Sequence, residues 1–280
     1  MTELITLTEH EAQSLISTWK ANPNDVPELE HQLHCVDGRI TYSHPNYSDS
    51  AFKCPICQTR LEQHKREQDL QQRMTQAGIP PRYLELEWND LDMLEPLPSI
   101  QHACTELKTI LLEGESLYLH GPPGSGKTQA AIMVAKTAVR SGFSTRVVNM
   151  GRLCVRVRQG YSEQRSTEQQ NADQRKQARI TEEDALEMLG TSDFLILDDL
   201  GAGEARQAVL EQRLLYLGLE ERQNRRLPTI ITSNLAADVL IERLGSRLLN
   251  RLQPLTVLEV VHGRNFRFPE HRQQRWTRAW

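Results

Sequence analysis

An octapeptide with the sequence GPPGSGKT constrains the fold of this chain more than any other feature, because it fits the phosphate-binding pattern GxxxxGK[ST] at every fixed position. An apolar and aromatic run precedes it at residues 116–120 and predicts a buried strand, and residues 128–139 have the composition of a helix. In such a strand-loop-helix setting, glycines let several backbone N–H groups point at one spot, where the helix N-terminus adds partial positive charge. The octapeptide therefore predicts a site for two or three phosphates, formed by Gly121, Pro122, Pro123, Gly124, Ser125, Gly126, Lys127 and Thr128.

Two residues of this loop have expected chemical roles. Lys127 should lie along the outer phosphates, and the Thr128 hydroxyl should be one ligand of a magnesium ion that keeps most of its waters. A phosphate-binding loop alone cannot position the metal or activate water, so a second group of polar residues should follow in the sequence. ATP and Mg²⁺ are therefore the expected cofactors.

The sequence FLILDD at residues 194–199 supplies that second group. Its four apolar residues predict a strand buried on both faces, and its two carboxylates emerge where ligands of an open parallel sheet collect. We expect Asp198 to be the magnesium partner and Asp199 to orient or deprotonate the attacking water. The structural alternative is an exposed Asp pair that only ends a strand before Gly201.

A third strand is predicted at residues 229–233, and it ends in Asn234. An amide at the end of a central strand can hold the attacking water or a γ-phosphate oxygen by hydrogen bonds without carrying charge. An Asn before a turn is otherwise an ordinary cap. The two preceding motifs favour the catalytic interpretation.

Six motifs in a fixed order resemble the AAA+ helicase loaders of the DnaC and DnaI type, and the related IstB-type transposition ATPases. They are AGIPPRYLELEW, GPPGSGKT, FLILDDLG, LPTIITSNL, LGSRLLNRL and GRNFR, and the resemblance covers roughly residues 77–267. It implies an α/β AAA+ P-loop ATPase with a parallel sheet flanked by helices. It also implies that Asn234 is the residue called sensor 1 and that Arg267 is sensor 2. Arg247 and Arg251 would lie near the γ-phosphate of the neighbouring subunit of a homo-oligomer, with Arg251 as the arginine finger.

The spacing of the two arginines supports this role independently. Arg247 and Arg251 are four residues apart, so on a helix they project from one face. A guanidinium offered in trans makes hydrolysis depend on assembly; the alternative is a solvated helix face. Many AAA+ ATPases carry Glu where this chain has Asp199, which is one methylene shorter. We therefore expect slow, assembly-dependent ATP hydrolysis.

The N-terminal region predicts a different kind of module. Residues 8–11 form a capping box that opens an amphipathic helix through about Lys20. Cys54 and Cys57 form a CPxC pair that is typical of a zinc knuckle. Cys35 has no cysteine partner, so a histidine must complete the set, and His31 and His34 are the candidates. A reduced thiol pair and a redox CxxC are the alternatives to structural zinc.

Composition shifts divide the chain into four regions. Residues 1–60 are the N-terminal helix plus the zinc-binding adaptor, 61–77 a helical linker, 78–267 the AAA+ ATPase domain, and 268–280 a basic tail with Trp276 and Trp280. The polar stretch 161–180 corresponds in the family to an insertion helix that lines a channel for single-stranded DNA, or it is a solvated excursion. The expected DNA contacts in and before this stretch are Arg152, Arg156, Arg158, Arg165, Arg175, Lys176 and Arg179.

Charge and cysteine content bound the remaining possibilities. The net charge of −4 does not by itself indicate nucleic-acid binding. Residues 242–280, however, hold eight Arg against three Glu and form a basic end that could lie along phosphates. Five cysteines with one CxxC, no long apolar run and no signal peptide predict a cytoplasmic protein without a membrane partner.

Together these observations predict an ATP-dependent loader of a hexameric replicative helicase onto single-stranded DNA, in which the N-terminal module contacts the helicase. Two alternatives stay open. An IstB-like transposition helper would share the core motifs but act on duplex DNA with a transposase. A nucleotide-gated scaffold for DNA or a partner protein would bind ATP with negligible turnover.

Overall fold

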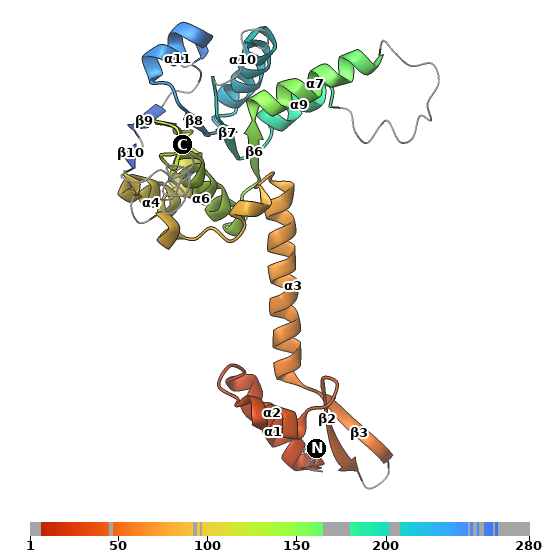
Figure 1. Cartoon of the computed structure of the whole chain (residues 1–280). Helices are drawn as coiled ribbons and strands as arrows, with labels where there is room; N and C mark the ends of the chain where they lie inside the picture. The colour runs from red at the N-terminus through yellow and green to blue at the C-terminus, as the bar shows by residue number, and fades with distance from the viewer. Residues whose placement is uncertain are drawn as a thin grey trace, which may run out of the picture. The chain divides into compact units, whose positions relative to one another are not determined.

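The computed structural model describes residues 7–44, 47–91, 94–95, 97–164, 180–201, 208–245, 247–248, 251, 255–259 and 261–262. The chain divides into two compact units, residues 1–71 and 72–280, which we call the N-terminal unit and the C-terminal unit (Figure 1). Five residues with expected roles lie outside the described residues, namely Arg165, Arg175, Lys176, Arg179 and Arg267. The tail that contains Trp276 and Trp280 lies outside them as well.

The N-terminal unit combines helices with a small sheet. Its elements are β1 (Leu7–Thr8), α1 (Glu9–Ala21), α2 (Glu28–His34), β2 (Arg39–His44), β3 (Tyr47–Lys53) and the first part of α3 (Pro55–Gln76). β1 pairs with β2 in parallel, and β2 pairs with β3 in antiparallel orientation. The expected capping box is present, because the Thr8 hydroxyl accepts from the Glu11 N–H and the Glu11 carboxylate accepts from the Thr8 N–H.

A small apolar core holds this unit together. Ala12, Ile16 and Trp19 of α1 pack against Ile40 and Ile56, and Trp19 is 1% exposed. The expected linker helix is longer than the sequence indicated: α3 begins at Pro55, which suits the first helical turn because proline has no N–H to satisfy there. Cys57 therefore lies in the first turn of α3.

The C-terminal unit is built on a five-stranded, wholly parallel sheet. Its strands are β5 (Ser116–His120), β6 (Thr145–Asn149), β7 (Phe194–Asp198), β8 (Thr229–Ser233) and β9 (Leu255–Glu259), in the order β6-β7-β8-β5-β9. The three strands expected from the sequence, before the phosphate-binding loop, before the Asp pair and before Asn234, are present as β5, β7 and β8. The fold class predicted from the sequence, an α/β P-loop module with helices around a parallel sheet, is confirmed.

The remaining elements of this unit surround the sheet (Figure 1). They are the 3-10 helices η1 (Pro81–Tyr83) and η2 (Trp88–Leu91), the helices α4 (Leu97–Thr105), α5 (Leu107–Glu113), α6 (Lys127–Arg140), α7 (Met150–Gln164), α9 (Glu182–Gly190), α10 (Ala208–Asn224) and α11 (Ala237–Leu244), and the antiparallel pair β4 (Leu94–Glu95) and β10 (Val261–His262).

Alternation along the strands assigns side chains to the two faces of the sheet. Leu195 and Leu197 of β7 and Ile231 of β8 pack into one core with α7, α9, α10 and α11. The helix α6 contacts β5, β6, β7 and β8 and packs against α4. Both faces are covered, and no residue of the three central strands β5, β7 and β8 is exposed, as expected for buried parallel strands.

The end of α3 is attached to the edge strand β6. The Val147 N–H donates to the Ala77 carbonyl at 2.7 Å, and Arg146 Nη1 donates to the Gln76 carbonyl at 2.8 Å. Gly78 then turns the chain with φ +83°, and a Cβ at that position would lie 2.7 Å from the Val147 carbonyl oxygen. Only glycine fits this turn without displacing β6.

A buried lysine anchors the segment that follows. Lys136 of α6 is fully buried, and its ammonium donates to the Leu84 carbonyl at 2.8 Å and to the Leu86 carbonyl. Burial lowers the pKa of Lys136, while Glu87, 3.7 Å away, opposes that shift. These contacts fix the chain just after η1.

No helix among the described residues combines the length and the apolar character needed to cross a membrane.

The Gly78 turn generates a stability prediction. We expect Gly78→Ala to destabilise the C-terminal unit by roughly 2–4 kcal/mol, because the left-handed backbone penalty adds to a collision with Val147. Gly142 is the matched control, since its φ is +92° but nothing lies within 4 Å of its Cβ position. Gly142→Ala should cost only the backbone penalty of roughly 1–2 kcal/mol. Urea unfolding followed by circular dichroism measures both, and equal losses would contradict the docking of Gly78 on β6.

Candidate nucleotide and metal sites

A single cavity of about 1150 Å³ gathers most of the residues that the sequence singled out. It opens at the carboxyl ends of β5, β7 and β8, which are adjacent in the sheet. Its lining includes Gly124, Gly126, Lys127, Thr128, Asp198, Asp199 and Asn234. The phosphate-binding loop, the Asp pair and the terminal Asn therefore share one site, as the sequence predicted.

The phosphate-binding loop has the backbone shape that its glycines allow. Gly124 and Gly126 have φ of +84° and +93°, a region that other residues rarely adopt. The helix α6 begins at Lys127, so its first N–H groups, which lack partners within the helix, lie at the loop. The Lys127 ammonium donates to the carbonyls of Gly121 and Pro122, both at 2.8 Å, which holds it over the loop. A polyphosphate would be bound by these backbone N–H groups and this ammonium.

The Asp198 carboxylate is fixed from two sides. Its Oδ1 accepts from the Thr128 hydroxyl at 2.8 Å and from the Thr232 hydroxyl at 2.8 Å. Carboxylate and hydroxyl oxygens are the ligands that Mg²⁺ takes in phosphate sites, with waters completing an octahedron. Thr128 Oγ1 and Asp198 fit this ion, directly or through one of its waters.

Asp199 has an unusual backbone for a residue with a side chain. Its φ is +60°, and its N–H donates to the Thr232 hydroxyl at 2.9 Å. Asn234 Nδ2 lies 3.4 Å from Asp199 Oδ1, so the two polar groups expected to handle the attacking water touch each other. Left-handed backbone at a non-glycine residue is typical of sites where position matters more than local stability.

The wall formed by residues 78–83 was not assigned a role from the sequence. Gly78, Pro80, Pro81, Arg82 and Tyr83 all line the cavity, and the Arg82 guanidinium lies 4.6 Å from the centre of the Tyr83 ring. The only available signal was the motif AGIPPRYLELEW, whose paired prolines indicate a fixed turn but not what it faces. This wall has the apolar and aromatic character that suits a nucleotide base or ribose.

Two arginines expected to contact DNA line the same cavity. Arg152 and Arg156 of α7 lie on its wall with Asn149, whose side chain accepts from the Arg152 N–H at 3.0 Å and so caps α7.

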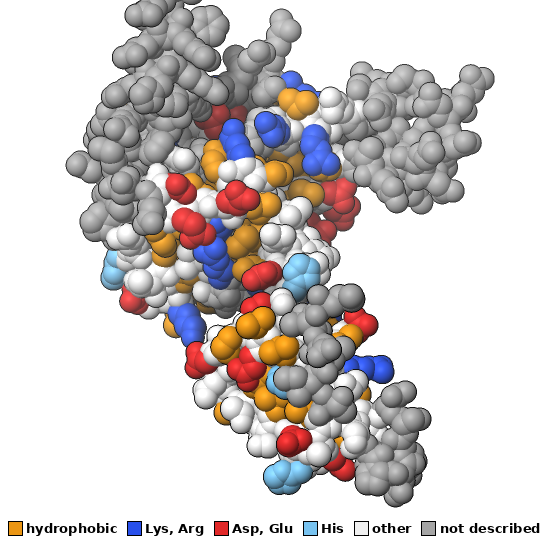
Figure 2. Space-filling view, turned by 60° about the horizontal axis from the view of Figure 1, so that its bottom comes forward, with side chains coloured by type: hydrophobic (Ala, Val, Ile, Leu, Met, Phe, Trp, Pro, Cys, Tyr) orange, Lys and Arg blue, Asp and Glu red, His pale blue; other side chains and the backbone are white. Residues whose placement is uncertain are grey.

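Acidic and basic side chains are interspersed on the face shown in Figure 2, where the described residues form no continuous basic patch. The net charge of −4 is consistent with this mixture.

Arg247 and Arg251 have different environments. Arg247 is exposed, whereas the Arg251 side chain is only 15% exposed. The Arg251 guanidinium lies 3.9 Å from the centre of the Tyr216 ring, and its Nη2 donates to Glu220 Oε1 at 3.0 Å. Arg251 is therefore paired with α10 of its own chain.

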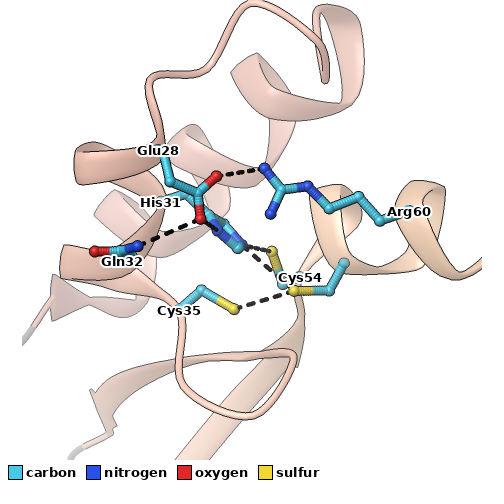
Figure 3. A network of polar contacts seen from close by, with 7 residues as sticks. Glu28, His31, Gln32, Cys35, Cys54 and Arg60 are labelled. Carbon is cyan, nitrogen blue, oxygen red and sulfur yellow. Dashed lines mark hydrogen bonds and ion pairs between the residues drawn. The ribbon is translucent and has the colours of Figure 1, made fainter.

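Four side chains of the N-terminal unit point toward one another (Figure 3). The ligand atoms of His31, Cys35, Cys54 and Cys57 all lie within 4.8 Å of one another. His31 Nε2 is 3.4 Å from Cys54 Sγ and 3.3 Å from Cys57 Sγ, and Cys35 Sγ is 3.5 Å from Cys57 Sγ. Zinc with bonds of about 2.0–2.3 Å holds its four ligands roughly 3.5–3.8 Å apart. The four ligand atoms lie close enough together to hold one such ion.

The structure selects His31 over His34 for this cluster, because His34 is not among the four grouped residues. Glu28 lies near His31 without a hydrogen bond to it: its Oε1 is 3.8 Å from His31 Nδ1, and its Oε2 accepts from Arg60 Nη2 at 2.5 Å. The hydrogen bond from Arg60 lowers the pKa of Glu28. A carboxylate behind the second ring nitrogen is the usual support for a metal-bound histidine.

Burial works against ionised thiols in this cluster. It raises the pKa of Cys35 to about 12 and also raises the pKa of Cys57. A divalent cation among the sulfurs would reverse this balance, because a coordinating thiol is deprotonated by the metal. The two other cysteines, Cys104 and Cys154, lie in α4 and α7.

Comparison with solved structures finds several similar chains. The chain is similar to the crystal structure of DnaI, with 22% identity, 67% of this chain and 94% of that one covered, and a TM-score of 0.48. It is similar to the crystal structure of the DnaC helicase loader, with 22% identity, 65% and 99% covered, and a TM-score of 0.47. Domain III of the replication initiation protein DnaA from Thermotoga maritima matches with 16% identity, 65% and 68% covered, and a TM-score of 0.47. No curated protein matches the chain in sequence.

The sequence profile of IstB-like ATP binding proteins matches residues 56–253, a span that includes the phosphate-binding loop, the Asp pair and Asn234. That span covers more than half of the chain and contains every described residue of the cavity. This protein therefore belongs to the IstB-like ATP binding protein family, on the AAA+ P-loop fold.

Proposed function

We propose that this protein hydrolyses ATP and uses that reaction to load a replicative DNA helicase onto single-stranded DNA. The observation that carries the ATPase assignment is the convergence of Lys127, Thr128, Asp198, Asp199 and Asn234 on one cavity. A loop that only bound phosphate would need neither a second carboxylate nor an amide beside it.

Each residue has a distinct role in the proposed reaction. Lys127 and the loop N–H groups hold the β- and γ-phosphates, and Thr128 with Asp198 holds Mg²⁺, which neutralises charge that develops on the phosphate oxygens. Asp199 accepts a hydrogen bond or a proton from the attacking water, and Asn234, in contact with it, orients that water. Asp199 is shorter than glutamate and sits on a constrained backbone, so we expect turnover to be slow.

The proposed finger in trans requires a change of partner. Arg251 must leave Glu220 and Tyr216 of its own α10 before its guanidinium can reach a neighbour's triphosphate. A triphosphate carries more negative charge than one carboxylate, so a correctly placed neighbour can outcompete Glu220. Arg247, which is exposed, is free of that constraint on its approach to a neighbour. Hydrolysis would then follow assembly of a homo-oligomer.

The His/Cys cluster supports the helicase-loading part of the proposal. We propose that it holds one structural zinc ion through His31, Cys35, Cys54 and Cys57, and that the zinc stabilises a compact module for a protein partner. The N-terminal unit has a small apolar core, so we expect it to need metal–ligand bonds for stability. In this chain the module precedes the ordered motifs that resemble those of the DnaC- and DnaI-type loaders.

One specific observation favours a second candidate function. The family profile is that of IstB-like proteins, which makes a transposition helper the main rival. The two functions differ in DNA and partner, since the rival would act on duplex DNA with a transposase. IstB-type ATPases usually have a helical N-terminal part without a CPxC, so the His/Cys cluster of this chain favours the loader. Negligible turnover would instead indicate the scaffold.

The catalytic assignment predicts a split between binding and hydrolysis. Lys127→Ala should lose nucleotide binding and hydrolysis together, because the phosphates lose their main cation. Asp199→Asn should keep binding within a few-fold and lose about 10²–10³ in kcat, since the amide cannot accept the water's proton. Fluorescent-nucleotide titration and phosphate release measure the two properties. Equal hydrolysis by Asp199→Asn and the wild-type chain would exclude Asp199 as the water-activating group.

A mixing experiment tests the finger in trans. Arg251→Ala should lose about 10³-fold or more of the assembly-stimulated rate while binding ATP normally. Asp199→Asn subunits carry an intact Arg251 but cannot hydrolyse, whereas Arg251→Ala subunits carry an intact catalytic cavity. Mixing the two inactive variants should restore activity at hybrid interfaces, as measured by phosphate release. A mixture no more active than its components would show that Arg251 does not act across subunits.

The zinc site and the partner are tested with one pair of variants. The wild-type chain should contain close to one zinc per chain, His31→Ala should lose most of it, and His34→Ala should keep it. Metal content is read by plasma mass spectrometry. The amount of replicative helicase that each variant captures in a pull-down should follow its zinc content. His34→Ala should capture it strongly and His31→Ala weakly. Zinc-free wild-type protein would overturn the metal assignment.

Helicase-loading assays separate the rival functions. ATP-dependent placement of the helicase on single-stranded circles supports the loader. Preferential ATP-dependent binding to duplex DNA, with capture of a transposase and not of the helicase, would favour the transposition helper and contradict our proposal.

A further inference from the structure

Thr232 contacts both residues of the Asp pair, although no motif assigned it a role. It is the fourth residue of β8 and is 1% exposed. Its hydroxyl donates to Asp198 Oδ1 at 2.8 Å and accepts from the Asp199 N–H at 2.9 Å. Its carbonyl accepts from the Leu200 N–H at 2.8 Å. One residue thus makes three hydrogen bonds to three successive residues.

The register of the sheet explains why this position is special. The pairing of β7 with β8 runs from Leu195 opposite Thr229 to Leu197 opposite Ile231. Asp198 and Thr232 are the next pair along, where β7 turns away from the ladder into the loop after it. The Thr232 hydroxyl therefore connects the end of β7 to β8 through a side-chain atom, in addition to the backbone hydrogen bond from the Leu200 N–H to the Thr232 carbonyl.

The hydroxyl has one proton, so its two contacts define a direction. It gives that proton to Asp198 Oδ1, and its lone pair receives the Asp199 N–H. Because Oδ1 already accepts from Thr128 and Thr232, the other oxygen of Asp198 is the one available to magnesium or its water. The bond to Asp199 also offsets the cost of roughly 1–2 kcal/mol for left-handed backbone at a residue with a side chain.

We propose that Thr232 is a positioning residue that sets both carboxylates of the site with a single hydroxyl. It fixes which oxygen of Asp198 faces the metal, and it holds the backbone of Asp199 so that its carboxylate meets Asn234. This inference rests on the proposed ATP hydrolysis and deepens it. It assigns to Thr232 the alignment of the metal partner with the water-activating group.

Two substitutions in the full-length chain test this role. Thr232→Val has the same shape without the hydroxyl, and Thr232→Ser keeps the hydroxyl without the methyl group. Thr232→Val should lower kcat by about 10–100-fold with KM changed less than about threefold, because alignment and not nucleotide binding is lost. It should also raise the Mg²⁺ concentration needed for tight binding of a fluorescent ATP analogue by about tenfold. Thr232→Ser should restore both properties to within about threefold of the wild-type values.

A stability control separates positioning from simple loss of structure. Thr232→Val leaves the Asp199 N–H without this acceptor, so some destabilisation is expected. Gly142→Ala is a destabilised variant whose Cβ position contacts nothing. Its kcat and Mg²⁺ dependence should match the wild-type values, which would show that lost stability alone does not reproduce the Thr232→Val effect.

The outcomes distinguish this inference from the proposed function. Wild-type protein that binds the ATP analogue but releases no phosphate would overturn the ATPase proposal. The Mg²⁺ dependence of analogue binding by Thr232→Val would still test the positioning role of Thr232. Normal kcat and normal Mg²⁺ dependence in Thr232→Val would overturn the positioning role. A Thr232→Ser variant as defective as Thr232→Val would overturn it too, because the methyl group and not the hydroxyl would then matter.

Discussion

The site depends on the parallel pairing of β5, β8 and β7 side by side. Parallel strands bring their carboxyl ends to one edge, so whatever follows each strand is placed within reach of its neighbours. The phosphate-binding loop follows β5, the Asp pair ends β7, and Asn234 follows β8. The first and last of these positions, Gly121 and Asn234, are 234 − 121 = 113 residues apart in the sequence, and the sheet brings them together. Hydrogen bonds from Thr128 and Thr232 to Asp198 then connect the first turn of α6 with the ends of β7 and β8.

Most of this core site could be predicted from the sequence because its signals are local. The glycines of the loop, the apolar run before Asp198 and the polar end of TIITSN each indicate a strand end with a particular chemistry. The order of strands was not needed to name the residues. Once the α/β class was identified, the parallel arrangement of the strands required that their carboxyl ends, and the residues after them, lie at one edge of the sheet.

The features that sequence reasoning missed are contacts between residues with ordinary local signals. Thr232 looks like any β-branched residue in a strand, and only its register opposite Asp198 reveals its contacts. Arg251 was expected to project from the same helix face as Arg247 toward a neighbouring subunit, but its guanidinium contacts a carboxylate and an aromatic ring of α10 in its own chain. The choice between His31 and His34 likewise needed coordinates, because both lie near Cys35 in the sequence and only one ring reaches the sulfurs.

The attachment of residues 76–78 to β6 has a further consequence for solubility. Among the described residues, β6 is the last strand on its side of the sheet, and edge strands with unpaired N–H and C=O groups are templates for pairing with other chains. The Ala77 carbonyl occupies the Val147 N–H, and the close approach of Gly78 covers the Val147 carbonyl. The same turn that forms one wall of the cavity therefore blocks a route to edge-to-edge aggregation.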